Sequence, residues 1–116
     1  MVDLTGTRWL AEEVAGQRVL VDSVPSLEFD DTGSVGGTTG VNRFHAAYTV
    51  DGDAIELGPI ITTLMAGTPE AMNQEYAWLQ VLGSRCAARL DEAGRLVLEG
   101  GATTLLLRRG EVPELL

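Results

Sequence analysis

The chain has no lysine and contains only one cysteine, Cys86, and one histidine, His45. A single cysteine excludes a disulfide within the chain, and we expect Cys86 to be a small buried hydrophobic residue. A lone histidine cannot build a histidine-rich metal site, so no metal or other cofactor is expected. Thiol and metal chemistry are therefore poor starting points for a function.

Long apolar segments are also missing. The apolar stretches, of which Thr104–Leu107 is typical, are far shorter than the roughly 20 residues that span a bilayer, so we expect no integral membrane segment. The opening sequence MVDLTGTRWL has neither the basic and apolar regions of a signal peptide nor a cysteine for a lipid anchor. These features favour the cytoplasm, although removal of a leader would leave the same sequence.

Acidic residues outnumber basic ones by 17 to 8, which gives a net charge of −9. Such a chain repels phosphate backbones and anionic membranes, which argues against a nucleic-acid partner. Hydrophobic residues make up 45% of the 116 positions, enough for residues 1–116 to form a single domain with its own core. Composition by itself indicates no reaction.

Short alternating runs separated by turn signals predict an antiparallel sheet. Segments with this pattern are Thr7–Val14, Arg18–Val21, Ser26–Phe29, Ser34–Gly36, Arg43–Val50, Ala54–Leu57, Ile60–Met65, Arg85–Leu90, Arg95–Glu99 and Thr103–Arg108. The predicted α+β fold is a curved antiparallel sheet or partial barrel of about seven or eight short strands packed on one helix, because a flat sheet would leave long edges. The last residues, Glu111–Leu116, are expected to fray.

One helix interrupts the sheet, at about residues 69–82. Thr68 is a good N-cap, Pro69 suits the first helical position, and Gly83 is a plausible stop. Apolar residues recur near helical spacing and predict the face that packs on the sheet; they are Met72, Tyr76, Leu79 and Leu82.

Several segments in order along the chain resemble those of one family. They are Leu4–Leu10 (LTGTRWL), Leu27–Phe29 with Gly33 and Gly36, Gly40–Phe44 (GVNRF) with Tyr48, and Thr63–Ala66 (TLMA). Together they resemble the META domain family, which includes the heat-shock protein HslJ. The chain departs from the pattern at Val41 and Gly67, where the family often has cysteine, and this departure fits a reducing compartment.

The resemblance implies a compact antiparallel sheet around one helix, but it does not imply an enzyme. Family members look like small stress-response or envelope-related proteins of poorly defined activity. We therefore expect a non-enzymatic domain that binds an unknown protein or small molecule.

Four polar residues are the candidates for a ligand or partner site: Asn42, Arg43, His45 and Glu75. Asn42 could contact a ligand or hold its own loop through backbone hydrogen bonds. Arg43 could grip an anion or pair with an acidic side chain, and Glu75 is a candidate partner if it faces the sheet. His45 is predicted on the solvent face, opposite the apolar side of its strand.

No catalytic set is predicted, since no serine lies in a nucleophile-elbow pattern beside these residues. Two alternatives remain open. One is a small hydrolase or isomerase that uses the four candidates, which requires that they converge in one pocket. The other is a carrier of a small apolar molecule inside a barrel cavity. Trp9 and Trp78 are expected in the core.

Overall fold

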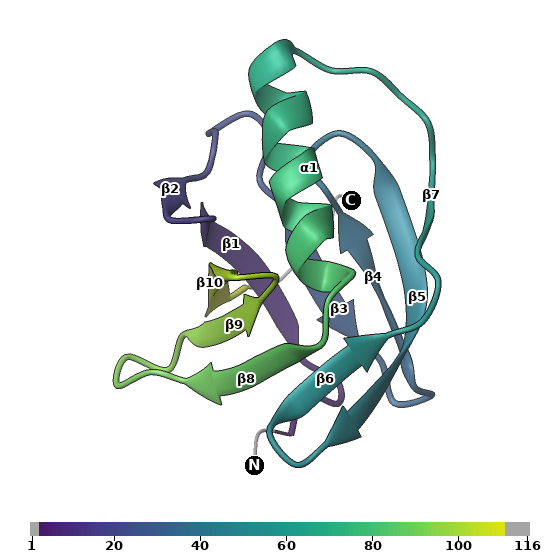
Figure 1. The fold of residues 1–116 in the computed structure, drawn as a ribbon, viewed down its shortest axis with the longest axis vertical. Coiled ribbons are helices and arrows are strands. Elements are labelled where there is room, and N and C mark those ends of the chain that lie inside the picture. Colours follow the sequence, from purple (N-terminus) through teal and green to yellow (C-terminus); the bar gives the residue numbers. More distant parts are fainter. Residues whose placement is uncertain (1–2, 111–116) are drawn as a thin grey trace, which may run out of the picture.

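The computed structural model describes residues 3–110, and the fraying expected for Glu111–Leu116 lies outside them. The strands are β1 (Arg8–Val14), β2 (Gln17–Arg18), β3 (Ser26–Phe29), β4 (Ser34–Thr38), β5 (Arg43–Asp51), β6 (Ala54–Leu57), β7 (Ile61–Thr62), β8 (Cys86–Leu90), β9 (Leu96–Gly100) and β10 (Thr103–Arg109). The helix α1 spans Pro69–Leu82 and packs on β1, β9 and β10 (Figure 1).

Eight of the strands form a closed antiparallel barrel in the order β1–β3–β4–β5–β6–β8–β9–β10. The ring closes because β10 pairs with β1, from Trp9 opposite Arg109 to Val14 opposite Leu105. The short strands β2 and β7 lie outside the ring and pair with β1 and β5. The predicted fold class is confirmed, and closure leaves the ring without a free edge strand. Within residues 3–110 no helix is both long and apolar enough to cross a lipid bilayer.

The core fills the space between the barrel wall and α1. Trp9 and Trp78 are 1% and 0% exposed, which confirms that both tryptophans belong to the core. Cys86 is 2% exposed, as expected for a buried hydrophobic residue. Burial raises the pKa of its thiol to about 11, so Cys86 is not a reactive nucleophile.

The helix begins and ends where its capping signals predict. The Thr68 side chain accepts a hydrogen bond from the Ala71 N–H, and the Gly83 N–H bonds back to Leu79 O. The predicted buried face is only partly right: Leu82 is buried and Leu79 packs on the core, but Tyr76 is 68% exposed. The buried helix residues are Ala71, Glu75, Trp78, Val81 and Leu82. The helix is turned by about one residue, or roughly 100°, because polar partners accommodate Glu75 in the interior.

The segment predicted as a strand over Ile60–Met65 pairs with β5 only at Ile61 and Thr62. Leu64 and Met65 are 96% and 63% exposed. Thr63 still donates its N–H to Arg43 O at 3.0 Å, and beyond it the side chain of Asn42, in place of a β5 backbone, bonds Met65. The return strand predicted over Arg18–Val21 is also shorter, and Gln74 of α1 instead bonds the chain after it.

Candidate functional site

A buried polar cluster joins α1 to the loop before β5. The Glu75 carboxylate, 9% exposed, accepts hydrogen bonds at Oε2 from Thr39 Oγ1 at 2.5 Å and from Asn42 Nδ2 at 2.8 Å. Thr39 and Asn42 are 0% and 4% exposed. Thr39 Oγ1 also accepts the backbone N–H of Asn42 at 2.9 Å. These charge-assisted hydrogen bonds stabilise a carboxylate that would otherwise be costly to bury.

The other side of Asn42 holds the segment that follows β7. Asn42 Oδ1 accepts the Met65 N–H at 2.6 Å and the Thr63 hydroxyl at 2.9 Å. Asn42 Nδ2 also donates to Met65 O at 3.1 Å. The amide therefore bonds both backbone groups of Met65, as a neighbouring strand would, and it has no group left for a ligand.

The expected pairing of Arg43 with Glu75 is wrong. Glu75 lies inside the domain with Thr39 and Asn42, whereas the Arg43 side chain is exposed on the outer face of β5. Strand alternation explains the separation, since the buried Phe44 next to Arg43 points inward. Arg43 has no carboxylate within salt-bridge distance among residues 3–110.

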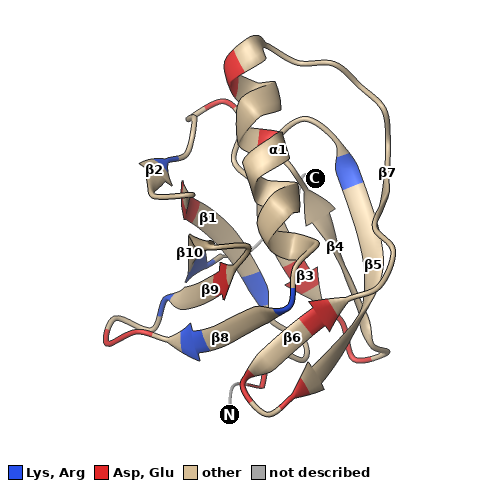
Figure 2. Ribbon diagram, in the orientation of Figure 1, with Lys and Arg blue, Asp and Glu red and all other residues tan. Residues whose placement is uncertain are grey.

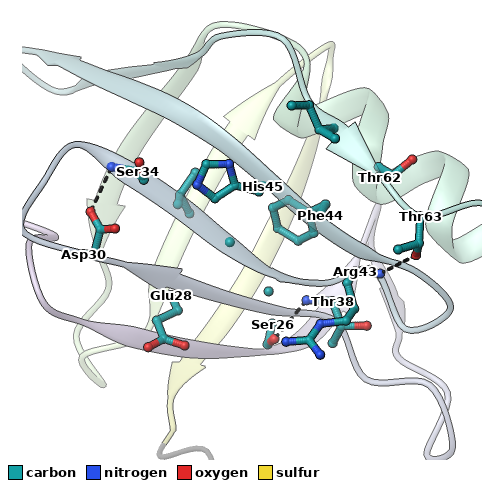
Figure 3. A pocket seen from close by; sticks show the side chains of 14 residues that line it. Ser26, Glu28, Asp30, Ser34, Thr38, Arg43, Phe44, His45, Thr62 and Thr63 are labelled. Carbon is teal, nitrogen blue, oxygen red and sulfur yellow. Dashed lines mark hydrogen bonds between the residues drawn. The ribbon is translucent and has the colours of Figure 1, made fainter.

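An open groove, here called the outer groove, lies on the outer face of β3, β4, β5 and β7 (Figure 3). Its volume is about 730 Å³. The register places Gly36 between Glu28 on β3 and His45 on β5, and Ile61 of β7 continues the row. Because Gly36 has no side chain, a gap opens between the side chains of Glu28 and His45.

The two walls of the outer groove differ in charge. Glu28 and Asp30 line the β3 side, and Arg43 and His45 line the β5 side. Arg43 is the only Lys or Arg residue of β5 and is the blue segment of that strand in Figure 2. The Glu28 carboxylate is already paired with Arg8 at 3.1 Å. Arg43 therefore offers the uncommitted charge of this face.

Asp30 marks the end of the groove away from Arg43. Its Oδ1 accepts the backbone N–H groups of Ser34 and Thr32 and the Thr32 hydroxyl, each at 2.9 Å. The Ser34 hydrogen bond is the main reason why the pKa of Asp30 lies below its ordinary value of 3.8. Asp30 is thus a charged acceptor at neutral pH, fixed in place by its own turn.

The buried cluster and the outer groove meet at Thr63. Its hydroxyl donates to Asn42 Oδ1 at 2.9 Å and accepts the backbone N–H of Arg43 at 3.0 Å. A chain of hydrogen bonds therefore runs from Glu75 through Asn42 and Thr63 to the backbone of Arg43. The cluster fixes one end of the groove from behind.

The four sequence-predicted residues do not share one pocket. Asn42 and Glu75 lie together inside, whereas Arg43 and His45 lie on the groove outside. Within residues 3–110 no group of three or more His, Cys, Asp or Glu side chains could hold a metal ion. Sequence reasoning missed the groove as a site, although Gly36 on the outward face of a predicted strand was a signal of a gap.

Comparison with known proteins gives a family and a fold. The family model described as the META domain matches residues 2–112. No curated protein matches the chain. Two NMR structures share the fold. A protein from Burkholderia xenovorans has a TM-score of 0.74 and 20% identity, over 92% of this chain and 83% of that one. A second protein has a TM-score of 0.78 and 22% identity, over 93% of this chain and 95% of that one.

Proposed function

This chain belongs to the META domain family, and from that premise we propose that it is a non-catalytic binding protein of the HslJ type whose binding face is the outer groove. Binding in the course of a stress response, which the family resemblance suggests, is part of the same proposal. The observation that carries it is the uncommitted Arg43 in an open groove of about 730 Å³. In the buried cluster, by contrast, the protein's own groups already occupy the amide of Asn42 and the carboxylate of Glu75.

The geometry supports binding over catalysis. A general base needs a nucleophile or substrate within hydrogen-bond reach and a group that orients it. Among the described residues His45 has no hydrogen bond to a hydroxyl or a carboxylate, and Glu75 lies on the other side of β5. The alternative hydrolase or isomerase would need these residues to move together.

The packing also supports an external site over an internal carrier cavity. Large side chains that are 0–2% exposed occupy the interior of the barrel; they include Trp9, Trp78, Phe29, Leu96 and Leu105. A carrier would need an apolar void among these residues, whereas the outer groove already offers an accessible volume.

Chemical-shift mapping tests the proposal. We would titrate ¹⁵N-labelled protein with a fragment library of small acids, amines, sugars and short peptides, and follow every backbone amide. We expect the perturbed amides to cluster at Gly36, Gly37, Arg43 and His45. The matched control Arg89→Gln removes an exposed arginine from β8, outside the groove, and should leave binding unchanged. Perturbations confined to other faces would refute the proposal, as would a turnover lost in both His45→Ala and Glu75→Ala.

A further inference from the structure

We propose that the outer groove recognises the C-terminal end of an extended peptide. The terminal carboxylate binds Arg43, and an apolar last side chain lies over the backbone of Gly36, which forms the floor of the groove. This inference rests on the proposed function, since it names the ligand of that same groove. It follows from the charge, the shape and the hydrogen-bonding groups along the groove.

Arg43 is the group that would bind the anionic end of the ligand. Its guanidinium lies at the end of the groove beside Ser26 and Thr38 (Figure 3). A guanidinium presents five donors in a planar fork that matches the two oxygens of a carboxylate. Ser26 Oγ accepts the backbone N–H of Thr38 at 3.3 Å, which leaves the Ser26 hydroxyl hydrogen available as one more donor. An anion of this size can therefore be bound from two sides.

The middle of the groove accommodates an apolar side chain. In the row Glu28–Gly36–His45 the backbones of Glu28 and His45 lie two strand spacings apart, roughly 10 Å, and the Gly36 between them has no side chain. Ile61, at 70% exposure, follows His45 in the same row and adds an exposed apolar side chain on the β7 side of the groove. Water on such an apolar surface is released when a hydrophobic side chain covers it.

The length of the groove favours a peptide over a simple fatty or aromatic acid. From Ser26 to Asp30 along β3 is four residues, or roughly 13 Å, which is the length of an extended peptide of about four residues. Polar groups line this distance, including the Ser34 hydroxyl and His45. At the far end the second oxygen of the Asp30 carboxylate accepts no hydrogen bond from the described residues. Peptide amides would use these groups, and a hydrocarbon acid would not.

The overall charge selects among peptides. A protein of net charge −9 repels ligands that carry several negative charges. One terminal carboxylate, held directly on Arg43, is compatible with that field, whereas a run of acidic side chains is not.

Isothermal titration calorimetry with defined peptides tests the inference. The probes are N-acetyl tetrapeptides Ala-Ala-Ala-X, where X is Leu, Ile, Phe or Met, each as the free acid and as the C-terminal amide. 4-Methylpentanoate serves as the simple-acid probe. We expect at least one peptide acid to bind, and both its amide and 4-methylpentanoate to bind at least tenfold more weakly. Equal binding of acid and amide, or of peptide and 4-methylpentanoate, would overturn the inference.

Two variants locate the binding on the groove. Arg43→Gln should weaken the peptide acid at least tenfold and leave the amide unchanged, and Gly36→Val should abolish both by filling the floor. Arg89→Gln and Gly58→Ala are matched controls, because Arg89 lies on β8 and a Cβ at Gly58 meets only ordinary contacts of 3.9 Å and 4.0 Å. Circular dichroism confirms that each variant is folded.

The outcomes separate the inference from the proposed function. If no peptide acid binds at 5 mM while another fragment perturbs the groove, the inference is wrong and the proposed function stands. If the peptides perturb only other faces, both are wrong. If Arg43→Gln binds the peptide acid as the unmodified protein does, the assignment of the carboxylate to Arg43 is wrong.

Discussion

The substitution Asn42→Asp reverses the hydrogen-bonding role of one atom and leaves the shape of the side chain unchanged. In the native protein Asn42 Nδ2 donates to Glu75 Oε2 at 2.8 Å and to Met65 O at 3.1 Å. After the substitution both become contacts between oxygen acceptors. The bonds that Oδ1 accepts from Thr63 and Met65 remain possible, so the variant removes only the two bonds that Nδ2 donates, to Glu75 of the helix and to Met65 O.

The expected destabilisation is set by the cheaper of two responses. Two charges 2.8 Å apart repel by about 6 kcal/mol at an effective dielectric constant of 20. Protonating one ordinary carboxyl group at pH 7 costs about 4 kcal/mol, so the pair takes up a proton instead. The free energy of unfolding should therefore fall by about 3–4 kcal/mol, a large share of the roughly 5–15 kcal/mol of a small domain.

Proton uptake also fixes the pH dependence. The folded variant binds one more proton than its unfolded state, so its stability rises as the pH falls. Between pH 7 and pH 5 the deficit relative to the unmodified protein should shrink by about 2–3 kcal/mol. Urea unfolding, followed by the fluorescence of the buried Trp9 and Trp78 and by far-UV circular dichroism, measures both values.

A double-mutant cycle with Glu75→Gln provides the control. The new amide at position 75 can donate to the new carboxylate at position 42, so the double variant should recover most of the lost stability. Equal destabilisation by Asn42→Asp in both backgrounds would refute the reasoning, as would a deficit that is the same at pH 5 and pH 7.

Three further predictions concern other parts of the molecule. Because burial raises the pKa of Cys86 to about 11, the native thiol should react with a disulfide reagent at pH 8 only as fast as the protein unfolds; rapid labelling in the folded state would contradict this. Leu105→Ala should lower the free energy of unfolding by about 2–5 kcal/mol, whereas Leu64→Ala, at a position 96% exposed, should change it by at most about 0.5 kcal/mol. The pKa of Asp30 is lowered, mainly because its carboxylate accepts the Ser34 N–H. The contribution of Asp30 to folding stability is therefore complete above the ordinary carboxyl pKa and is lost as the pH falls through the lowered pKa. Asp30→Asn should thus reduce stability at pH 7 and flatten its loss in acid titrations.

Local signals in the sequence account for most of the fold. The alternation of apolar residues located β3 and β6 with their observed bounds, and the Thr68 cap with Gly83 located α1. Closure of the barrel by β1 and β10 lies beyond such signals, because these strands are near opposite ends of the chain. The pairing is non-local, and no short-range pattern specifies it.

The helix face shows where apolar periodicity misleads. Counting hydrophobic residues places Tyr76 on the face that packs on the sheet and leaves the side of Glu75 undecided, whereas the structure exposes Tyr76 and buries Glu75. The burial of Glu75 depends on Asn42 and Thr39, which lie more than 30 positions away in the sequence and donate to the Glu75 carboxylate. A buried charge is predictable from sequence only when its partners are known, and here they come from a different element.

Two adjacent glycines of β4, Gly36 and Gly37, have different roles, one in the groove and one in the fold. Gly37 has φ +148°, and a Cβ there would clash with the backbone oxygen of Ser26, so the fold itself requires glycine at this position. Gly36 is less constrained, since no positive φ is required there and an added Cβ would lie 3.3 Å from the backbone oxygen of Phe44, a tight contact but not the clash found at Gly37. Glycine inside a strand weakens the sheet and often marks a place where a ligand or another backbone approaches closely. Because Gly36 lies between Glu28 and His45, the side chain that it lacks is what opens the floor of the outer groove.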